Sequence, residues 1–290
     1  MQLAKEQLDE LEDKGYILLP SLLSKSEIDL IRAELPGIFA EVSPKRVLEE
    51  GGELIRSVYG CHAANEIVRD LTQLPRVVEP AMQILDSKVY VYQSKINAKA
   101  AFGGDVWQWH QDFIFWRNED GMPMPRVINV AIFLDEVNEF NGPMLVIPGS
   151  HKEGIVETLA RDLFSQDGSE RASVYKDKPK WISNLTANLK YSLDKETIKS
   201  LVNKYGIASI KGSAGSVLFF HSNLVHASTH NISPFDRAVI MISFNSVENI
   251  PVPVDNPRPG FLSSTDTMPL VAISDDALLM RSSSAQSTRN

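Results

Sequence analysis

The chain has 290 residues, of which 43% are hydrophobic and 23% charged. These ordinary values exclude a disordered chain and a collagen-like or coiled-coil design. The net charge of −8 disfavours nucleic acid and anionic lipid as partners, and no apolar run approaches the ~20 residues of a membrane span. The single cysteine, Cys61, allows no intrachain disulfide, and the charged first fifteen residues do not resemble a secretory signal. We therefore expect a cytoplasmic protein without a nucleic-acid or membrane partner.

The first part of the chain predicts helices around one short strand. Gly15 is a typical residue to end a helix, and Ser24 and Glu27 have the spacing of a capping box. A Pro-Gly pair at 36–37 should stop the helix that the capping box begins. From these signals we expect helices before Gly15, from the capping box to Pro36, and over 65–85 with a break near Pro75, and a strand over 16–19.

From residue 88 the hydrophobic pattern alternates as in β-strands. Lys88 to Ile96 predicts a strand with Val89, Val91 and Gln93 on one face. Further short, β-branched or aromatic segments bounded by turn residues predict strands over Arg126–Leu134, Met144–Ile147, Ser216–Phe220 and Arg237–Asn245. Many short strands without helices between them favour an antiparallel barrel or jelly roll.

One domain over 1–290 accounts for this pattern, mainly β with flanking helices. Residues 1–87 form its mostly helical part, and 88–151 with 207–250 form the sheet core. Residues 152–206 are rich in Lys, Asp and Ser and lack strand alternation, which indicates an insertion of helix and loop. Such an insertion can be a lid over a site or a passive surface excursion. The polar segment 282–290 is expected to be a disordered tail.

His110 and Asp112 are two residues apart, so on a strand they would share one face. His226, 116 residues later, is a candidate for a third ligand. Two histidines and one carboxylate form the facial triad of non-haem iron(II) oxygenases, which leaves coordination positions open. The pair alone is a weak pattern, and His110 could instead be a hydrogen-bonded histidine among aromatic neighbours.

Arg237 lies 11 residues after His226 and opens an apolar strand. A guanidinium at the mouth of a buried strand needs an anion, and it binds a carboxylate through two parallel hydrogen bonds. The distal carboxylate of 2-oxoglutarate is one such anion. The alternative is an ion pair at the barrel rim with Asp236 or Asp135.

The chain resembles the phytanoyl-CoA dioxygenase family and, by motif, its ectoine hydroxylase branch. The motifs that carry this resemblance, over about residues 10–265, are the opening GYILLP at 15–20, GMP at 121–123, NGPMLVIPGSH at 141–151, FFHSNLVHAS at 219–228 and NISPFDR at 231–237. The family implies a double-stranded β-helix of the cupin-like jelly-roll type. It also implies iron(II), with 2-oxoglutarate and O2 as cosubstrates.

The resemblance also implies roles for single residues. His110, Asp112 and His226 would be the metal ligands and the catalytic centre. Gln93, Asn97, Ser228 and Arg237 would line the cosubstrate and substrate sites, the last two binding the distal carboxylate of 2-oxoglutarate. Phe113, Phe115 and Trp116 would line the substrate pocket, although Trp116 could equally be a core residue.

The implied reaction is hydroxylation of an unactivated C–H bond in a small molecule, coupled to decarboxylation of 2-oxoglutarate to succinate and CO2. An amino acid is the expected substrate by analogy with the ectoine branch, and a more apolar specialised metabolite is the second expectation. Ile114 and Phe115 replace a more polar pair of that branch, which argues against ectoine itself. Asp112 occupies the position that a halogenase leaves to chloride, whereas desaturation, epoxidation and ring formation stay open. A cupin-like hydrolase or isomerase and a non-catalytic binding barrel are further alternatives. A monomer or a homodimer is expected.

Overall fold

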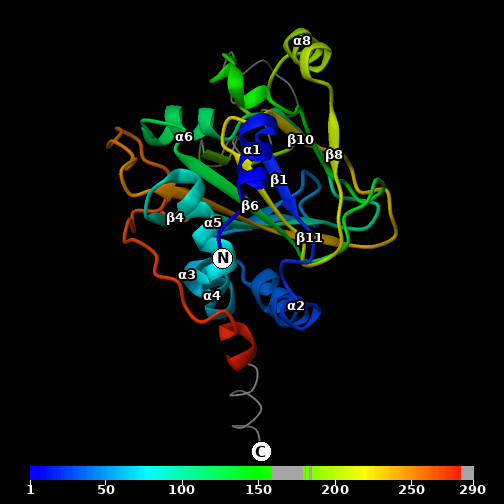
Figure 1. Ribbon diagram of the computed structural model, residues 1–290. Helices are drawn as coiled ribbons and strands as arrows, with labels where there is room; N and C mark the ends of the chain where they lie inside the picture. Colours follow the sequence, from blue (N-terminus) through cyan, green and yellow to red (C-terminus); the bar gives the residue numbers. More distant parts are fainter. Residues whose placement is uncertain (159–178, 180, 183–184, 282–290) are drawn as a thin grey trace, which may run out of the picture.

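Two antiparallel β-sheets form the centre of the structure (Figure 1), a computed structural model that describes residues 1–158, 179, 181–182 and 185–281. The larger sheet has the order β1-β9-β6-β11-β4-β3-β2 and the smaller one β5-β10-β7-β8. The seven strands of the larger sheet are β1 (Tyr16–Leu19), β2 (Arg46–Leu48), β3 (Ile55–Tyr59), β4 (Val89–Lys99), β6 (Val127–Phe133), β9 (Val217–His221) and β11 (Arg237–Ser246). The four strands of the smaller sheet are β5 (Trp107–His110), β7 (Met144–Val146), β8 (Ala208–Ile210) and β10 (His226–Ser228). This arrangement confirms the predicted jelly roll.

The central strand β11 is buried on both faces, and its alternation separates the two halves of the core. Ile240 and Ile242 face the helices, in one apolar cluster with side chains of the helical region. Val239 and Met241 face the smaller sheet, in a second cluster that includes Val146. The space between the two sheets is therefore lined from β11, β6 and β4 on one side and from β10, β7 and β5 on the other.

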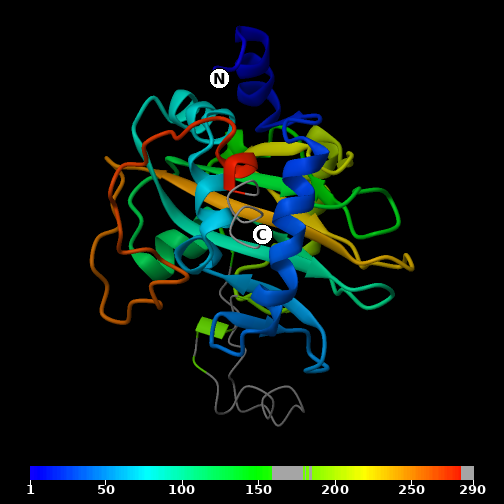
Figure 2. The same ribbon diagram turned by 90° about the horizontal axis from the view of Figure 1, so that it is seen from below.

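Helices cover the outer face of the larger sheet (Figure 2). Among the described residues, the labelled helices are α1 (Lys5–Lys14), α2 (Lys25–Ala40), α3 (Cys61–Ala64), α4 (Glu66–Gln73), α5 (Pro75–Leu85), α6 (Phe113–Asp120), the 3-10 turn η1 (Ser150–Glu153) and α8 (Lys195–Tyr205). The cluster on that face contains Ile28 and Ile31 of α2, Leu71 of α4 and Val78 of α5. These helices leave the space between the sheets free for a site.

The predicted signals at the helix ends are confirmed with one exception. Gly15 ends α1 with φ of 80°, and the Ser24–Glu27 capping box is formed. The helix α2, however, continues through Pro36 to Ala40. Ile38 and Phe39 pack against the core, so burial of these side chains outweighs the break that the Pro-Gly pair was expected to cause.

The alternation predicted for β4 is interrupted. The register with β11 shifts between Ser243 and Phe244, whose partners are Gln93 and Val91, so Tyr92 is an extra residue. Such a bulge reverses which side chains point to which face. Gln93 therefore does not share a face with Val91, as the sequence suggested, but points into the space between the sheets.

Two of the expected segments lie partly or wholly outside the described residues. Within the insertion predicted at 152–206, this applies to 159–178, 180 and 183–184, so the prediction of a lid is not tested; the predicted tail at 282–290 lies outside completely. Residues 185–193 of the insertion return to the sheets, where Leu193 N–H donates to the carbonyl of Trp109 at 2.8 Å, and the helix α8 follows them, as the prediction of helix and loop requires.

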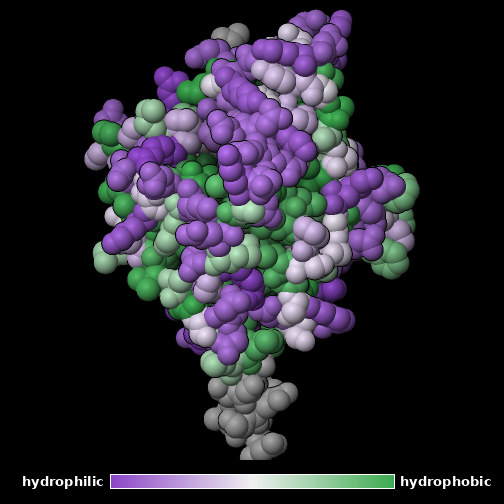
Figure 3. All heavy atoms as spheres, in the orientation of Figure 1, coloured by the Kyte–Doolittle hydropathy of each residue, from purple (hydrophilic) through white to green (hydrophobic). Residues whose placement is uncertain are grey.

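The surface around α1 is hydrophilic (Figure 3), as expected for a helix in which Leu11 is the buried residue. None of the helices in the described ranges has the length and the apolar composition that a membrane crossing requires.

Candidate active site

The two predicted histidine ligands meet where β5 pairs with β10. His110 ends β5, His226 begins β10, and the two are directly opposite in register, with ring centroids 4.2 Å apart. Asp112 is not on the strand, as the sequence suggested, but at the N-cap of α6 with helical φ and ψ of −71° and −39°. The chain turns after His110, and this turn carries the carboxylate to both imidazoles. The Asp112 oxygens lie 3.6 Å from His110 Nε2 and 3.8 Å from His226 Nε2.

Backbone carbonyls fix the tautomer of both histidines. His110 Nδ1 lies 2.6 Å from the carbonyl of Gln108, and His226 Nδ1 lies 2.9 Å from that of Leu224. A carbonyl only accepts, so each Nδ1 carries the proton and each Nε2 lone pair faces the carboxylate. Burial lowers the pKa of His226 to about 4, and His110 adds to this effect. His226 is therefore neutral near pH 7, the form that binds a metal.

The Asp112 carboxylate is held by groups that the sequence did not reveal. Asn129 Nδ2 of β6 donates to Asp112 Oδ2 at 2.9 Å, and Ser243 Oγ of β11 donates to Asn129 Oδ1 at 2.7 Å. Burial alone would raise the pKa of Asp112, but His226, His110 and the ammonium of Lys95 together hold it below its usual value. Asp112 is therefore an anion over the whole neutral range.

These three residues fit an iron(II) ion by the chemistry of their donors. Their ligand atoms all lie within 4.8 Å of one another. Two neutral imidazoles and one carboxylate are the donor set of non-haem iron(II), and three protein ligands leave positions for a cosubstrate and dioxygen. The hydrogen bonds to each Nδ1 and to Asp112 are the outer contacts that orient metal ligands.

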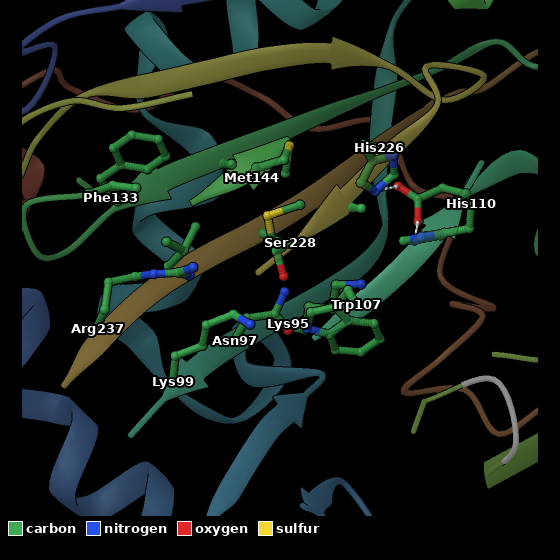
Figure 4. Close-up of a pocket in the computed structure, with 16 residues that line it drawn as sticks. Lys95, Asn97, Lys99, Trp107, His110, Phe133, Met144, His226, Ser228 and Arg237 are labelled. Atoms are coloured by element: carbon green, nitrogen blue, oxygen red, sulfur yellow. Dashed lines mark ion pairs between the residues drawn. The ribbon is translucent and has the colours of Figure 1, made fainter. Parts of the chain in front are cut away.

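A chamber between the sheets runs from the triad to Arg237 (Figure 4). Arg237, Lys99 and Asn97 lie at one end of this Arg237 chamber and the two histidines at the other, with Ser228 between them. Its remaining walls are largely apolar and come from Lys95, Trp107, Ala131, Phe133, Val137, Met144, Ala227, Val239 and Met241.

The Arg237 side chain has no carboxylate partner among the described residues. Its Nε donates to the carbonyl of Asn141 at 3.3 Å, and its Nη2 donates to that of Gly142. The alternative pair with Asp135 or Asp236 is not formed: Asp135 lies 3.1 Å from Arg32, and Asp236 accepts from the N–H of Ala101. Burial lowers the pKa of Arg237 to about 10, so the guanidinium is still charged at neutral pH. It is therefore a buried cation without an anionic partner among the described residues.

Lys99 is a second buried basic residue of this chamber, and the sequence did not single it out. Its Nζ donates to the carbonyls of Thr229, at 2.6 Å, and Asp105. Burial, helped by the charges of Arg237 and Arg56, lowers the pKa of Lys99 to about 6. Ser228 adds a polar group in need of a partner: its Oγ is buried without a hydrogen bond to any described residue. An anionic ligand would satisfy all of these groups.

A second chamber adjoins the triad. This Trp116 chamber shares Lys95, Trp107, His110 and Asp112 with the first and adds Tyr59, Gln93, Phe115, Trp116, Leu185, Leu189 and Arg258. Phe115 meets the His110 ring edge-on at 6.0 Å, and Trp116 packs against Tyr92 at 5.4 Å. Phe113, the third predicted aromatic residue, is buried and lines neither chamber.

The predicted residues thus separate into two groups. Asn97, Ser228 and Arg237 share the Arg237 chamber, whereas Gln93 lies in the Trp116 chamber and donates from Nε2 to the carbonyl of Leu262 at 2.6 Å. Lys95 faces both chambers. Its Nζ lies 5.4 Å from the centre of the Trp107 ring, and it has no hydrogen bond or ion pair to a described residue. The alternating Gln-x-Lys-x-Asn-x-Lys over 93–99 is the signal that could have revealed both lysines.

Comparison with known proteins agrees with this geometry. The model of the phytanoyl-CoA dioxygenase (PhyH) family matches residues 11–239. L-proline trans-4-hydroxylase of Streptomyces griseoviridis is 41% identical over 265 residues, 91% of this chain and 94% of that protein. The ectoine dioxygenase of Nocardia farcinica is 36% identical over 272 residues, 91% of this chain and 86% of that protein.

Solved structures show the same relationship. The crystal structure of EctD from S. alaskensis with 2-oxoglutarate and 5-hydroxyectoine aligns with a TM-score of 0.78 at 28% identity, over 94% of this chain and 88% of that one. EctD with bound Fe aligns over the same shares with a TM-score of 0.75 at 27% identity. With the His-Asp-His triad and the Arg237 chamber in place, the chain belongs to the phytanoyl-CoA dioxygenase family and is a dioxygenase that uses iron(II), 2-oxoglutarate and O2.

Proposed function

We propose that this enzyme hydroxylates a free amino acid, with L-proline as the first candidate. The observation that carries the proposal is the Trp116 chamber, which combines apolar walls with cationic side chains beside the triad. The identity of 41% to an L-proline trans-4-hydroxylase, over almost the whole of both chains, supports the same substrate.

In this proposal His110, Asp112 and His226 hold the metal. Iron(II), 2-oxoglutarate and dioxygen together supply the oxidation of an unactivated C–H bond, with release of succinate and CO2. Arg237 and Lys99 bind the distal carboxylate of 2-oxoglutarate, and Ser228 donates to it. The apolar walls of the Arg237 chamber exclude water around the cosubstrate. Excluding water strengthens each of these charged contacts.

The side chains that line the Trp116 chamber limit the chemical class of the substrate. Phe115, Trp116, Leu185 and Leu189 suit an aliphatic ring or chain. Lys95 and Arg258 suit a carboxylate, so a small amino acid satisfies both kinds of wall.

Other uses of the site have less support. A metal-dependent hydrolase or a non-catalytic barrel would leave the unpaired Arg237 cation without a role. Ectoine is the second candidate substrate, because the ectoine dioxygenase of Nocardia farcinica is 36% identical. Against it stands Phe115, an apolar wall at 6.0 Å from the His110 ring. Desaturation, epoxidation or ring formation would use the same cofactors and would appear as different products.

The test is a substrate screen with the iron-loaded enzyme. Succinate release is measured with 2-oxoglutarate and each of the common amino acids, ectoine and no addition, and the products are identified by mass and NMR. We expect L-proline to stimulate succinate release and to gain one oxygen atom. Stimulation by ectoine and by no amino acid would refute the proposed substrate class.

We further propose that the whole chain acts as one domain, in the cytoplasm, as a monomer or homodimer. The continuous sheets, to which both the N-terminal part and the segment 247–281 after β11 attach, support a single domain. The lone, buried Cys61 supports a reducing compartment. Sedimentation of the purified protein distinguishes a monomer from a dimer.

A further inference from the structure

A buried arginine of β3 contacts the walls of both chambers without lining either one. Arg56 is 1% exposed, and it is absent from the linings of the Arg237 chamber and the Trp116 chamber. All three nitrogens of its guanidinium donate: Nη1 to Glu49 Oε2 at 2.9 Å, Nη2 to the carbonyl of Val106 at 2.8 Å and Nε to the carbonyl of Leu185 at 3.0 Å. Arg56 therefore joins segments that lie 50 and 129 residues away from it in the chain.

The contact with Val106 fixes a wall that the two chambers share. Trp107, the next residue, lines both chambers, and Arg56 Cζ lies 3.8 Å from the centre of its ring. A guanidinium over the face of an indole ring is attracted to it, and more strongly where water is excluded. The same guanidinium thus holds both the backbone that leads into Trp107 and the Trp107 side chain.

The contact with Leu185 fixes a wall of the Trp116 chamber alone. Residues 185–189, called here the return segment, have a leucine at each end, and both Leu185 and Leu189 line that chamber but not the Arg237 chamber. The N–H of Leu189 donates to Gln108 Oε1 at 3.1 Å, which holds one end of the segment. Arg56 holds the other end through the carbonyl of Leu185.

Glu49 sets the position of the guanidinium. Its side chain is 9% exposed, and its second carboxylate oxygen accepts from the N–H of Asp105 at 3.1 Å. The carbonyl of Asp105 in turn accepts from Lys99, so this ion pair is also linked to the Arg237 chamber. The donors of a guanidinium are planar and fixed relative to one another. Pairing with Glu49 therefore directs the other two donors toward the carbonyls of Val106 and Leu185 at the same time.

We propose that Arg56 is a positioning residue of this oxygenase, which places the return segment and Trp107 as walls that hold the amino-acid substrate. The inference rests on the proposed function for the identity of the substrate, whereas the placement of the return segment is measurable without any substrate. A lysine can pair with Glu49, but it has one nitrogen on a flexible chain in place of three fixed donors. The role therefore requires an arginine and not only a positive charge.

The first experiment measures hydrogen exchange by mass spectrometry in the anaerobic, iron-loaded enzyme with 2-oxoglutarate and no amino acid. In Arg56→Lys the peptide that contains the return segment should exchange at least about tenfold faster than in the original enzyme, because a charge-assisted hydrogen bond that opposes local opening is lost. Arg76→Lys is the matched control. Arg76 forms a similar ion pair with Glu27 at 12% side-chain exposure but lines neither chamber, so the return segment should exchange in it as in the original enzyme.

The second experiment measures kcat and KM for L-proline together with the ratio of hydroxyproline to succinate. Arg56→Lys should raise KM by about tenfold and lower the product ratio below about one half, because a displaced wall no longer holds the reacting C–H bond toward the metal. A merely structural role would reduce the fraction of active enzyme, and so kcat, but would leave KM and the ratio unchanged. The Kd of 2-oxoglutarate should change by less than about threefold, since Glu49 still holds Asp105 and with it the acceptor of Lys99.

A double variant keeps the test decisive if Arg56→Lys does not fold. Arg56→Met with Glu49→Met removes both charges of the ion pair, so no unpaired charge is left in the interior. The return segment should exchange faster in this variant too, and KM for L-proline should rise as in Arg56→Lys.

The outcomes separate this inference from the proposed function. Unchanged exchange of the return segment, or an unchanged KM and product ratio, overturns the role of Arg56. A rise in the Kd of 2-oxoglutarate as large as the rise in KM also overturns it, because Arg56 would then act on the whole site. If the original enzyme turns over no amino acid, the proposed function fails, and the exchange of the return segment alone decides whether Arg56 positions this wall.

Discussion

Lys99 provides a sensitive test of the Arg237 chamber, because its protonation should change when 2-oxoglutarate binds. In the free protein, burial and the neighbouring charges of Arg237 and Arg56 lower the pKa of Lys99 to about 6. The amine is therefore almost entirely neutral at pH 7.5. A carboxylate placed beside Lys99 and Arg237 would favour the ammonium and raise its pKa toward the ordinary value of ~10.4.

The expected consequence is uptake of about one proton for each 2-oxoglutarate bound at pH 7.5. Between the pKa of Lys99 in the free protein, about 6, and its raised pKa in the complex, Lys99 is neutral in the free protein and charged in the complex. Binding in this pH range therefore takes up a proton. Affinity should be greatest below about pH 6 and should weaken as pH rises, by up to about tenfold in Kd per pH unit. His226, with a pKa of about 4, is already neutral in this range and does not contribute.

The assay is anaerobic calorimetry of the iron-loaded protein in two buffers of different ionisation enthalpy. The difference in observed heat gives the number of protons taken up. Lys99→Met should abolish the uptake, whereas Lys211→Met, at an exposed lysine near Glu139, should leave it near one. Uptake below about 0.2 protons in the unmodified protein would show that Lys99 is charged before binding or lies away from the carboxylate, and would refute its role in binding 2-oxoglutarate.

Three further predictions concern the metal, the cosubstrate and the fold. Asn129→Leu removes the hydrogen bond to Asp112 and should weaken iron(II) binding by about 10- to 100-fold in a competition with a chelator; unchanged affinity would contradict the supporting role. Arg237→Met should raise the Kd of 2-oxoglutarate by at least about tenfold, measured from the visible band, with iron binding retained. Gly15→Ala should cost about 1–3 kcal/mol of unfolding free energy, because φ is 80° and the new Cβ would lie 2.4 Å from a histidine ring. The matched variant Gly37→Ala meets nothing within 4 Å inside α2 and should stabilise by up to about 1 kcal/mol in urea unfolding.

The sequence by itself determined the class of the fold and the chemistry of the centre. Strand alternation, turn residues and capping signals depend on local geometry, so β1, β6, β9 and β11 could be located from the chain alone. The His110, Asp112 and His226 motif and the isolated Arg237 were recognisable because few other functions need those residue types together. The family resemblance then supplied the cofactors.

The tertiary structure decided how the side chains are shared between the two chambers. The bulge at Tyr92 reverses the alternation of β4 and turns Gln93 toward the site, and no local signal marks such an insertion. Asp112 begins a helix because α6 packs Phe115 and Trp116 into the chamber wall. Arg258 joins Asp120 across 138 residues, and that pairing depends on the course of the segment 247–281 after β11. Contacts of this kind are set by packing between distant segments, whereas the sequence pattern records only which residues are near one another along the chain.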